Sequence, residues 1–163
     1  MFRIASLAVL LLLSNLGVAQ DLDPSLAPQA TQYTADLEVL KTARKAQLAE
    51  ATRIYLLHLD TALKTPDLDA ATVAALKKER DGVASGLLTP ANPAGLPADI
   101  VTARKNFFSG VGKAAHDFTT GKKKIDDAYL KVLTGLSRKA NAKTAPAGLS
   151  AQVAAERRRV LGR

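Results

Sequence analysis

The chain has 163 residues and a net charge of +8 at pH 7, and it contains no cysteine, which excludes disulfide bonds, thiolate metal sites and cysteine nucleophiles. Alanine and leucine, which favour helices, dominate its apolar fraction, whereas aromatic residues make up only 4% and the residues that favour strands are scattered. We therefore expect an all-α protein with a thin core.

The first 19 residues have the pattern of a secretory signal peptide. A positive charge at Arg3 precedes an apolar run from Ile4 to Val18, and small residues stand at Gly17 and Ala19. This pattern predicts cleavage directly after Ala19. The alternative, an uncleaved anchor, is disfavoured because the run is shorter than the roughly 20 residues that cross a bilayer. We expect export to the periplasm or the extracellular space, and no transmembrane segment in the mature chain.

The basic excess is concentrated in the second part of the mature chain. Residues 20–95 carry 8 basic and 10 acidic side chains, whereas residues 96–163 carry 14 and 5, so their net charges are −2 and +9. This asymmetry predicts either attraction between the two parts or contact of the second part with an anionic component of the envelope. Nucleic acid is a poor partner for an exported chain, and we expect none.

After an irregular segment over residues 20–30, the first predicted element is a long helix over about residues 31–64. Its apolar side chains recur at three- and four-residue steps or their sums, as on one face of a helix. They are Leu37, Leu40, Leu48, Ala51, Tyr55, Leu59 and Leu63.

A turn at Thr65-Pro66-Asp67 ends this helix, and a second helix follows to about Ser85. Either Asp67 or Asp69 is placed to cap it, because an aspartate at this position accepts hydrogen bonds from the first backbone N–H groups. The order of helix, short turn and helix predicts an antiparallel hairpin over residues 31–86.

A connector with three prolines covers residues 87–98, and a second predicted hairpin occupies residues 99–163. Its long helix runs to about Lys139 and its shorter one from Leu149 to Leu161. Three glycines within the long helix, each costing roughly 1 kcal/mol against alanine, predict a bend or fraying there. They are Gly110, Gly112 and Gly121.

The two predicted hairpins are similar in sequence at an offset of 74 residues. The matched pairs are Tyr33 and Phe107, Leu37 and Val111, Leu40 and Ala114, Ala51 and Ile125, Tyr55 and Tyr129, and Leu59 and Leu133. Each long helix exceeds its return helix by roughly 20 Å at 1.5 Å per residue. The exposed overhangs predict an elongated, coiled-coil-like four-helix arrangement or packing on a second chain.

The apolar core at Tyr55–Leu63, the turn Asp67-Leu68-Asp69-Ala70 and the return helix with Glu79 also carry a resemblance. This combination resembles the tandem helical-hairpin modules of uncharacterised secreted bacterial proteins, over residues 31–86 and more weakly over 107–161. The resemblance implies the hairpin shape and no catalytic residues.

Candidate sites are few, and we expect no cofactor. The only histidines, His58 and His116, lack a second histidine at the spacing of a helical metal site, so we expect no bound metal. Asp126 and Asp127 follow Lys122 and Lys123 by four residues, which predicts ion pairs within one helix and not a catalytic carboxylate pair. No nucleophile elbow or phosphate loop is present.

Two basic groups and one apolar stripe are the remaining candidates. The basic groups are candidate contacts for an anionic surface, although charge runs on a helix are usually a solvated face that needs no partner; they are Lys122, Lys123, Lys124, Arg157, Arg158 and Arg159. The stripe is a candidate for packing or assembly; it comprises Leu37, Leu40, Tyr55, Leu59, Phe118, Ile125, Tyr129 and Leu133.

These features favour a non-enzymatic exported scaffold or protein-interaction module of the bacterial envelope, with a protein partner or self-association. One alternative is a periplasmic holdase-type chaperone, because small, basic, cysteine-free helical chains resemble the trimeric chaperones of outer-membrane proteins, although the β-rich body of those chaperones is not evident here. Another is binding to anionic envelope surfaces through the basic second part.

Overall fold

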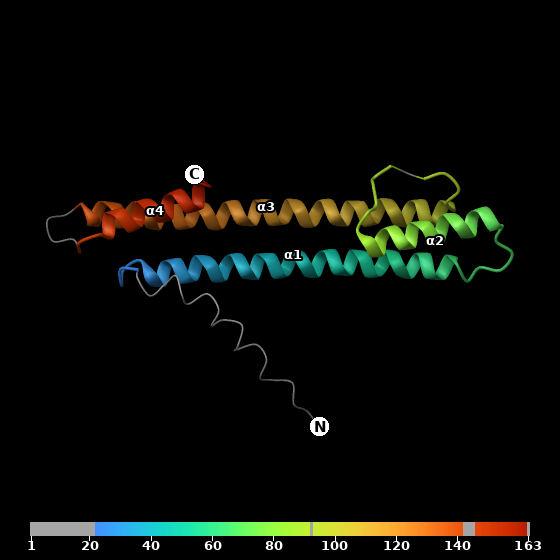
Figure 1. The fold of residues 1–163 in the computed structure, drawn as a ribbon, viewed down its shortest axis with the longest axis horizontal. Helices are drawn as coiled ribbons and strands as arrows, with labels where there is room; N and C mark the ends of the chain where they lie inside the picture. Colours follow the sequence, from blue (N-terminus) through green and yellow to red (C-terminus); the bar gives the residue numbers. More distant parts are fainter. Residues whose placement is uncertain (1–21, 92, 142–145, 163) are drawn as a thin grey trace, which may run out of the picture. The chain divides into compact units, whose positions relative to one another are not determined.

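The computed structural model describes residues 22–91, 93–141 and 146–162, and all regular structure in these residues is helical (Figure 1). The four helices are α1 (Ala27–Ala62), α2 (Ala70–Ser85), α3 (Ala98–Ala140) and α4 (Leu149–Leu161). The predicted all-α class is confirmed. The predicted signal peptide, residues 1–19, lies outside the described residues. Within the described part of the chain, no helix is long and apolar enough to cross a membrane.

Local sequence signals explain both ends of α2. Asp69 caps α2, because its side chain accepts a hydrogen bond from the backbone N–H of Thr72 at 2.8 Å. Asp67, the other predicted cap, instead adopts a left-handed conformation with a φ of 62° in the turn. Gly86 closes α2 with a φ of 69°, a conformation that glycine adopts without strain.

The predicted start of the first long helix is wrong, and of the two outcomes predicted for the second, a bend or fraying, fraying does not occur. α1 begins at Ala27, within the segment 20–30 that was expected to be irregular. Pro28 lies in its first turn, where a backbone N–H has no partner within the helix, so the proline costs nothing there. α3 stays helical through its glycines, and the predicted fraying does not occur. At Gly110 the glycine allows a close approach, since an added Cβ would lie 3.4 Å from the Ala51 Cβ.

The chain forms two compact units, and both long helices contribute to both units. Unit 2 is the continuous stretch Leu40–Thr120, and unit 1 combines the chain up to Val39 with the chain from Gly121 onward. Each unit therefore joins segments of both predicted hairpins.

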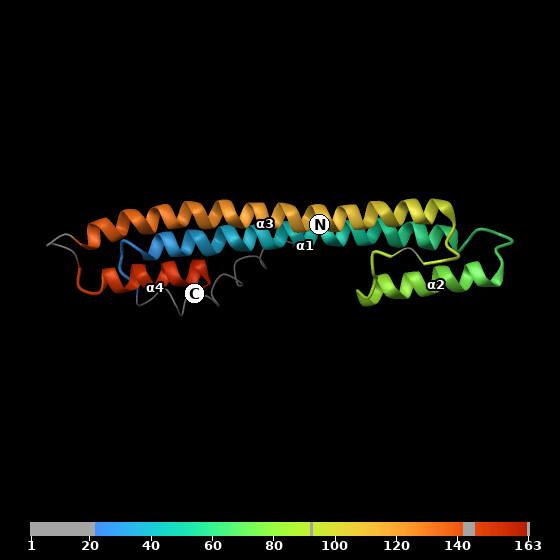
Figure 2. The same cartoon turned by 90° about the horizontal axis from the view of Figure 1, so that it is seen from above.

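In unit 2, α2 runs along the C-terminal part of α1 (Figure 2). The core is made by side chains from α1, α2 and the N-terminal part of α3: Tyr55, Leu59, Ala62, Leu76, Val83, Ile100 and Ala103. Tyr55 stacks on Phe107, which packs against this core, with ring centroids 5.2 Å apart. Three helices thus enclose one apolar cluster.

Unit 1 repeats this arrangement with the other ends of the long helices and with α4. Its core comprises Leu26, Ala30, Tyr33, Tyr129, Leu133, Leu136, Leu149 and Val153. Tyr33 stacks on Tyr129 with centroids 4.5 Å apart. At the 74-residue offset, Tyr33 corresponds to Phe107 and Tyr129 to Tyr55. The same ring pair therefore recurs in each unit, which supports the predicted sequence repeat.

Candidate functional site

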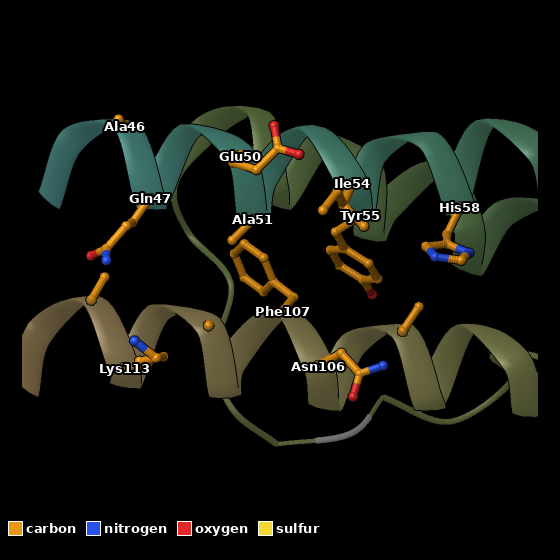
Figure 3. A pocket seen from close by; sticks show the side chains of 13 residues that line it. Ala46, Gln47, Glu50, Ala51, Ile54, Tyr55, His58, Asn106, Phe107 and Lys113 are labelled. Carbon is orange, nitrogen blue, oxygen red and sulfur yellow. The ribbon is translucent and has the colours of Figure 1, made fainter. Parts of the chain in front are cut away.

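An open apolar groove lies between α1 and α3 in unit 2 (Figure 3). Its volume is about 540 Å³. The α1 side chains that line it are Ala46, Gln47, Glu50, Ala51, Ile54, Tyr55 and His58, and those from α3 are Ala103, Asn106, Phe107, Gly110, Lys113 and Ala114. This groove is a candidate site for binding a partner.

The lining residues follow the spacing of a coiled-coil surface. On α1 the positions 47, 50, 51 and 54 have the i, i+3, i+4, i+7 pattern, and on α3 the positions 103, 106, 107 and 110 repeat it. Four residues in this pattern form the hole that receives one side chain of a neighbouring helix. The groove therefore has the geometry of a helix-binding surface.

Small side chains and aromatic rings form the floor. Ala51 faces Gly110 at the close approach of the two helices, and Ala114 is fully buried. The stacked rings of Tyr55 and Phe107 lie further along the groove. Ile54, at 43% exposure, is a large apolar side chain at the edge of the groove.

Three polar side chains that line the groove, Gln47, Glu50 and Lys113, have partners on their own or the opposite helix. Lys113 pairs with Asp117 at 2.7 Å, and this ammonium group holds the pKa of the Asp117 carboxyl below its usual range. Gln47 reaches Asp117 from α1 at 3.4 Å. Glu50 pairs with Arg53 at 2.7 Å. The charges are thus placed at the edge of the groove, and the floor is apolar.

A buried polar cluster joins the three helices of unit 2. The Tyr55 hydroxyl donates to Glu79 Oε1 at 2.8 Å, and Arg104 Nε donates to the same oxygen at 2.6 Å. Arg104 also donates to the backbone carbonyls of Thr89 and Pro90, at 2.6 and 3.2 Å. All three side chains are nearly inaccessible to solvent. The cluster fixes α2, α3 and the connector to one another.

Unit 1 has a counterpart built partly from different residues. The Tyr129 hydroxyl donates to Glu156 Oε2 at 3.0 Å, and Arg159, on the same helix as Glu156, pairs with that carboxylate at 2.6 Å. Arg159 also lies over the ring of Tyr33. The sequence shows a Glu-Arg pair in both short helices, but the arginines adjacent to the glutamates, Arg80 and Arg157, are not the ones that bind them.

The three tyrosines of the chain are buried, and the pKa of each hydroxyl group is raised. Burial, together with the hydrogen bond to Asp126, raises the pKa of Tyr33 to about 12. Burial and the hydrogen bonds to Glu79 and Glu156 likewise raise the pKa of Tyr55 and Tyr129. These groups stay neutral at physiological pH and serve as hydrogen-bond donors.

We expect an alkaline titration to show that the pKa of the tyrosines is raised by folding. The raised pKa means that the folded chain holds the tyrosine protons more tightly than the unfolded chain, whose tyrosines titrate near pH 10. Stability should therefore be retained below about pH 10 and decline as the pH rises toward 12. Tyrosinate absorbance of the folded protein should appear at higher pH than in urea, and coincident titration curves would contradict the prediction.

The predicted basic groups divide into paired and unpaired side chains. The expected ion pairs of Lys122 with Asp126 and of Lys123 with Asp127 are confirmed, at 2.6 and 2.7 Å. Arg159 is engaged by Glu156. The other three are exposed and have no hydrogen-bond or ion-pair partner among the described residues: Lys124, Arg157 and Arg158.

The predicted apolar stripe lies mainly in the two cores. Tyr55, Leu59, Tyr129 and Leu133 are buried, whereas Leu37, Leu40, Phe118 and Ile125 are half-buried. Both histidines are exposed, and His58 lines the groove. Within the described ranges, no group of three or more histidine, aspartate or glutamate side chains is arranged to hold a metal ion.

Comparison with known proteins adds no assignment: no protein family, curated protein or solved structure matches the chain.

Proposed function

We propose that this protein is an exported, non-enzymatic scaffold or interaction module of the bacterial envelope, built as two tandem helical hairpins in an elongated, coiled-coil-like arrangement. The observation that carries this proposal is the groove between α1 and α3 in unit 2. Export is supported by the signal-peptide pattern of residues 1–19. The sequence resemblance to secreted helical-hairpin modules supports the same conclusion.

The partner that fits the groove is an amphipathic helix. Side chains at i, i+3, i+4 and i+7 on two neighbouring helices form holes that accept apolar side chains at the same spacing on a third helix. The small residues Ala51 and Gly110 let such a helix approach the backbone closely. The edge charges carried by Glu50 and Lys113 would orient it.

Photo-crosslinking tests the groove, with one aspartate variant inside it and one outside. A photoreactive amino acid replaces the exposed lining residue Ala46, in the envelope of the bacterium that makes the protein. We expect a discrete adduct, and the crosslinked peptide should have apolar residues at helical spacing. Ile54→Asp should reduce the adduct at least about tenfold, because a carboxylate would be buried without a partner.

Leu57→Asp is the matched control. Leu57 lies on the same helix, is 58% exposed and does not line the groove. Both variants change exposed side chains, so helicity by circular dichroism should be unaffected. Equal loss of the adduct in the two variants, or no loss in either, would overturn the proposal.

A further inference from the structure

We propose that the N-terminal half of the chain (α1 and α2) and the C-terminal half (α3 and α4) are complementary partners, and that a second copy of the chain fits the same surfaces by exchange of halves. This inference rests on the two buried cores and does not depend on the groove.

Each core is completed by both halves. In unit 2, Tyr55 and Leu76 of the N-terminal half pack in one cluster with Ile100 of the C-terminal half. In unit 1, Leu26 of the N-terminal half packs in one cluster with Leu133 of the C-terminal half. Neither half holds a complete core, so each half carries the surface that the other one needs.

The two halves bring equivalent residues to these surfaces. At an offset of 74, the matched pair of Leu59 with Leu133 is buried, and so are two further pairs, Ile100 with Leu26 and Ala62 with Leu136. At an offset of 77, Leu76 matches Val153 and Glu79 matches Glu156, all of them buried. The start of the N-terminal half therefore completes the core formed by α3 and α4, and the N-terminal part of α3 completes the core formed by α1 and α2. The two halves contribute to each other's core in the same way, as two identical subunits of a symmetric dimer do.

The connector is the covalent link between the halves, and it follows α2. The Leu88 side chain folds back onto Gly82, and a Cβ added at Gly95 would lie 3.8 Å from the Ala75 Cβ. Gly82 and Ala75 are seven residues apart on α2, or about 10 Å along the helix. When the two halves of one chain pair, the connector therefore covers about 10 Å along α2 between Leu88 and Gly95.

Arg104 is a buried contact that joins the C-terminal half to both α2 and the start of the connector. Its bond to Glu79 joins the two halves and forms in either case. Its bonds to the carbonyls of Thr89 and Pro90 depend on the path of the connector. At the 74-residue offset, Arg104 corresponds to Ala30, so only the half that follows the connector carries this arginine. Arg104 thus holds an N-terminal half and a C-terminal half together.

Exchange between two copies gives a closed dimer. The N-terminal half of each copy pairs with the C-terminal half of the other, so both cores form twice and no complementary surface is left over. Exchange of identical elements is a low-cost route to a symmetric dimer because it uses contacts that already exist.

Deleting residues 89–94 from the full chain tests the inference. Leu88 and Gly95 would then be neighbours with Cα atoms about 3.8 Å apart, so the contact of Leu88 with Gly82 and that of Gly95 with Ala75, about 10 Å apart along α2, could not both be kept within one chain. Light scattering should give twice the mass of the parent chain. Circular dichroism should show unchanged helicity, and the pKa of the tyrosines should still be raised. A helical monomer would overturn the inference.

If the deletion variant does not fold, a second variant tests whether the two halves associate and exchange between copies. A protease site replaces residues 89–94 in the full chain, and the folded protein is cleaved there. We expect the two pieces to elute together as an equimolar complex, and mixing with a heavy-nitrogen-labelled cleaved sample should produce hybrids by native mass spectrometry. Separate elution, or the absence of hybrids, would overturn the inference. The uncleaved variant is the control and keeps the mass of the parent.

Discussion

Replacing Glu79 with alanine should lower the free energy of unfolding by about 3–5 kcal/mol, because it leaves the Arg104 guanidinium buried without its carboxylate. The Arg104 side chain is only 2% exposed and lies 2.6 Å from Glu79. The Tyr55 hydroxyl would lose its acceptor as well. Urea denaturation followed by far-UV circular dichroism measures the loss.

The repeat supplies a matched control, Glu156→Ala in unit 1. Its partner Arg159 has a side chain that is 49% exposed, so water replaces the lost carboxylate. We expect a smaller loss of about 1–3 kcal/mol, chiefly from the buried Tyr129 hydroxyl. Losses of equal size at the two sites would contradict the distinction between a buried and a solvated ion pair.

Truncating either of two equivalent leucines should destabilise its own unit by about 2–5 kcal/mol. Leu59 and Leu133 are both fully buried and correspond at the 74-residue offset. Leu59→Ala leaves a cavity in the unit 2 core, and Leu133→Ala does so in unit 1. Amide hydrogen exchange, read residue by residue, should show faster exchange first in the unit that carries the substitution.

Leu57→Ala is the control for this pair, since an exposed leucine on α1 should change stability by no more than about 0.5 kcal/mol. If Leu59→Ala accelerated exchange mainly in unit 1, the assignment of Leu59 to the unit 2 core would be wrong.

The elements were predictable where short-range chemistry decides them. The bounds of α4, Leu149–Leu161, agree with the prediction, and so does the end of α2 at Ser85. These ends depend on nearby glycines, Gly86 after α2 and Gly148 and Gly162 on either side of α4. The start of α1 was missed because Pro24 and Pro28 suggested an irregular segment, although a proline in the first turn of a helix is favourable.

The buried polar cluster was missed because it depends on contacts between distant segments. Arg104 follows the buried Ile100 by four residues, so it stands on the apolar face of α3. A cation at such a position was the available signal, but only the packing of α2 and the connector shows that it is buried. The groove was equally hidden, since the spacing of apolar residues does not reveal which part of a stripe another helix covers.

The division of the chain into one continuous and one discontinuous unit sets the order in which the protein can form. Unit 2 needs only residues 40–120, whereas the unit 1 core brings Leu26 together with Val153. A chain that emerges with its N-terminus first can therefore complete unit 2 while α4 has yet to appear. The N-terminal part of α1 cannot complete the unit 1 core before α4 has been synthesised. Until then a nascent chain has one complete core and one exposed apolar surface.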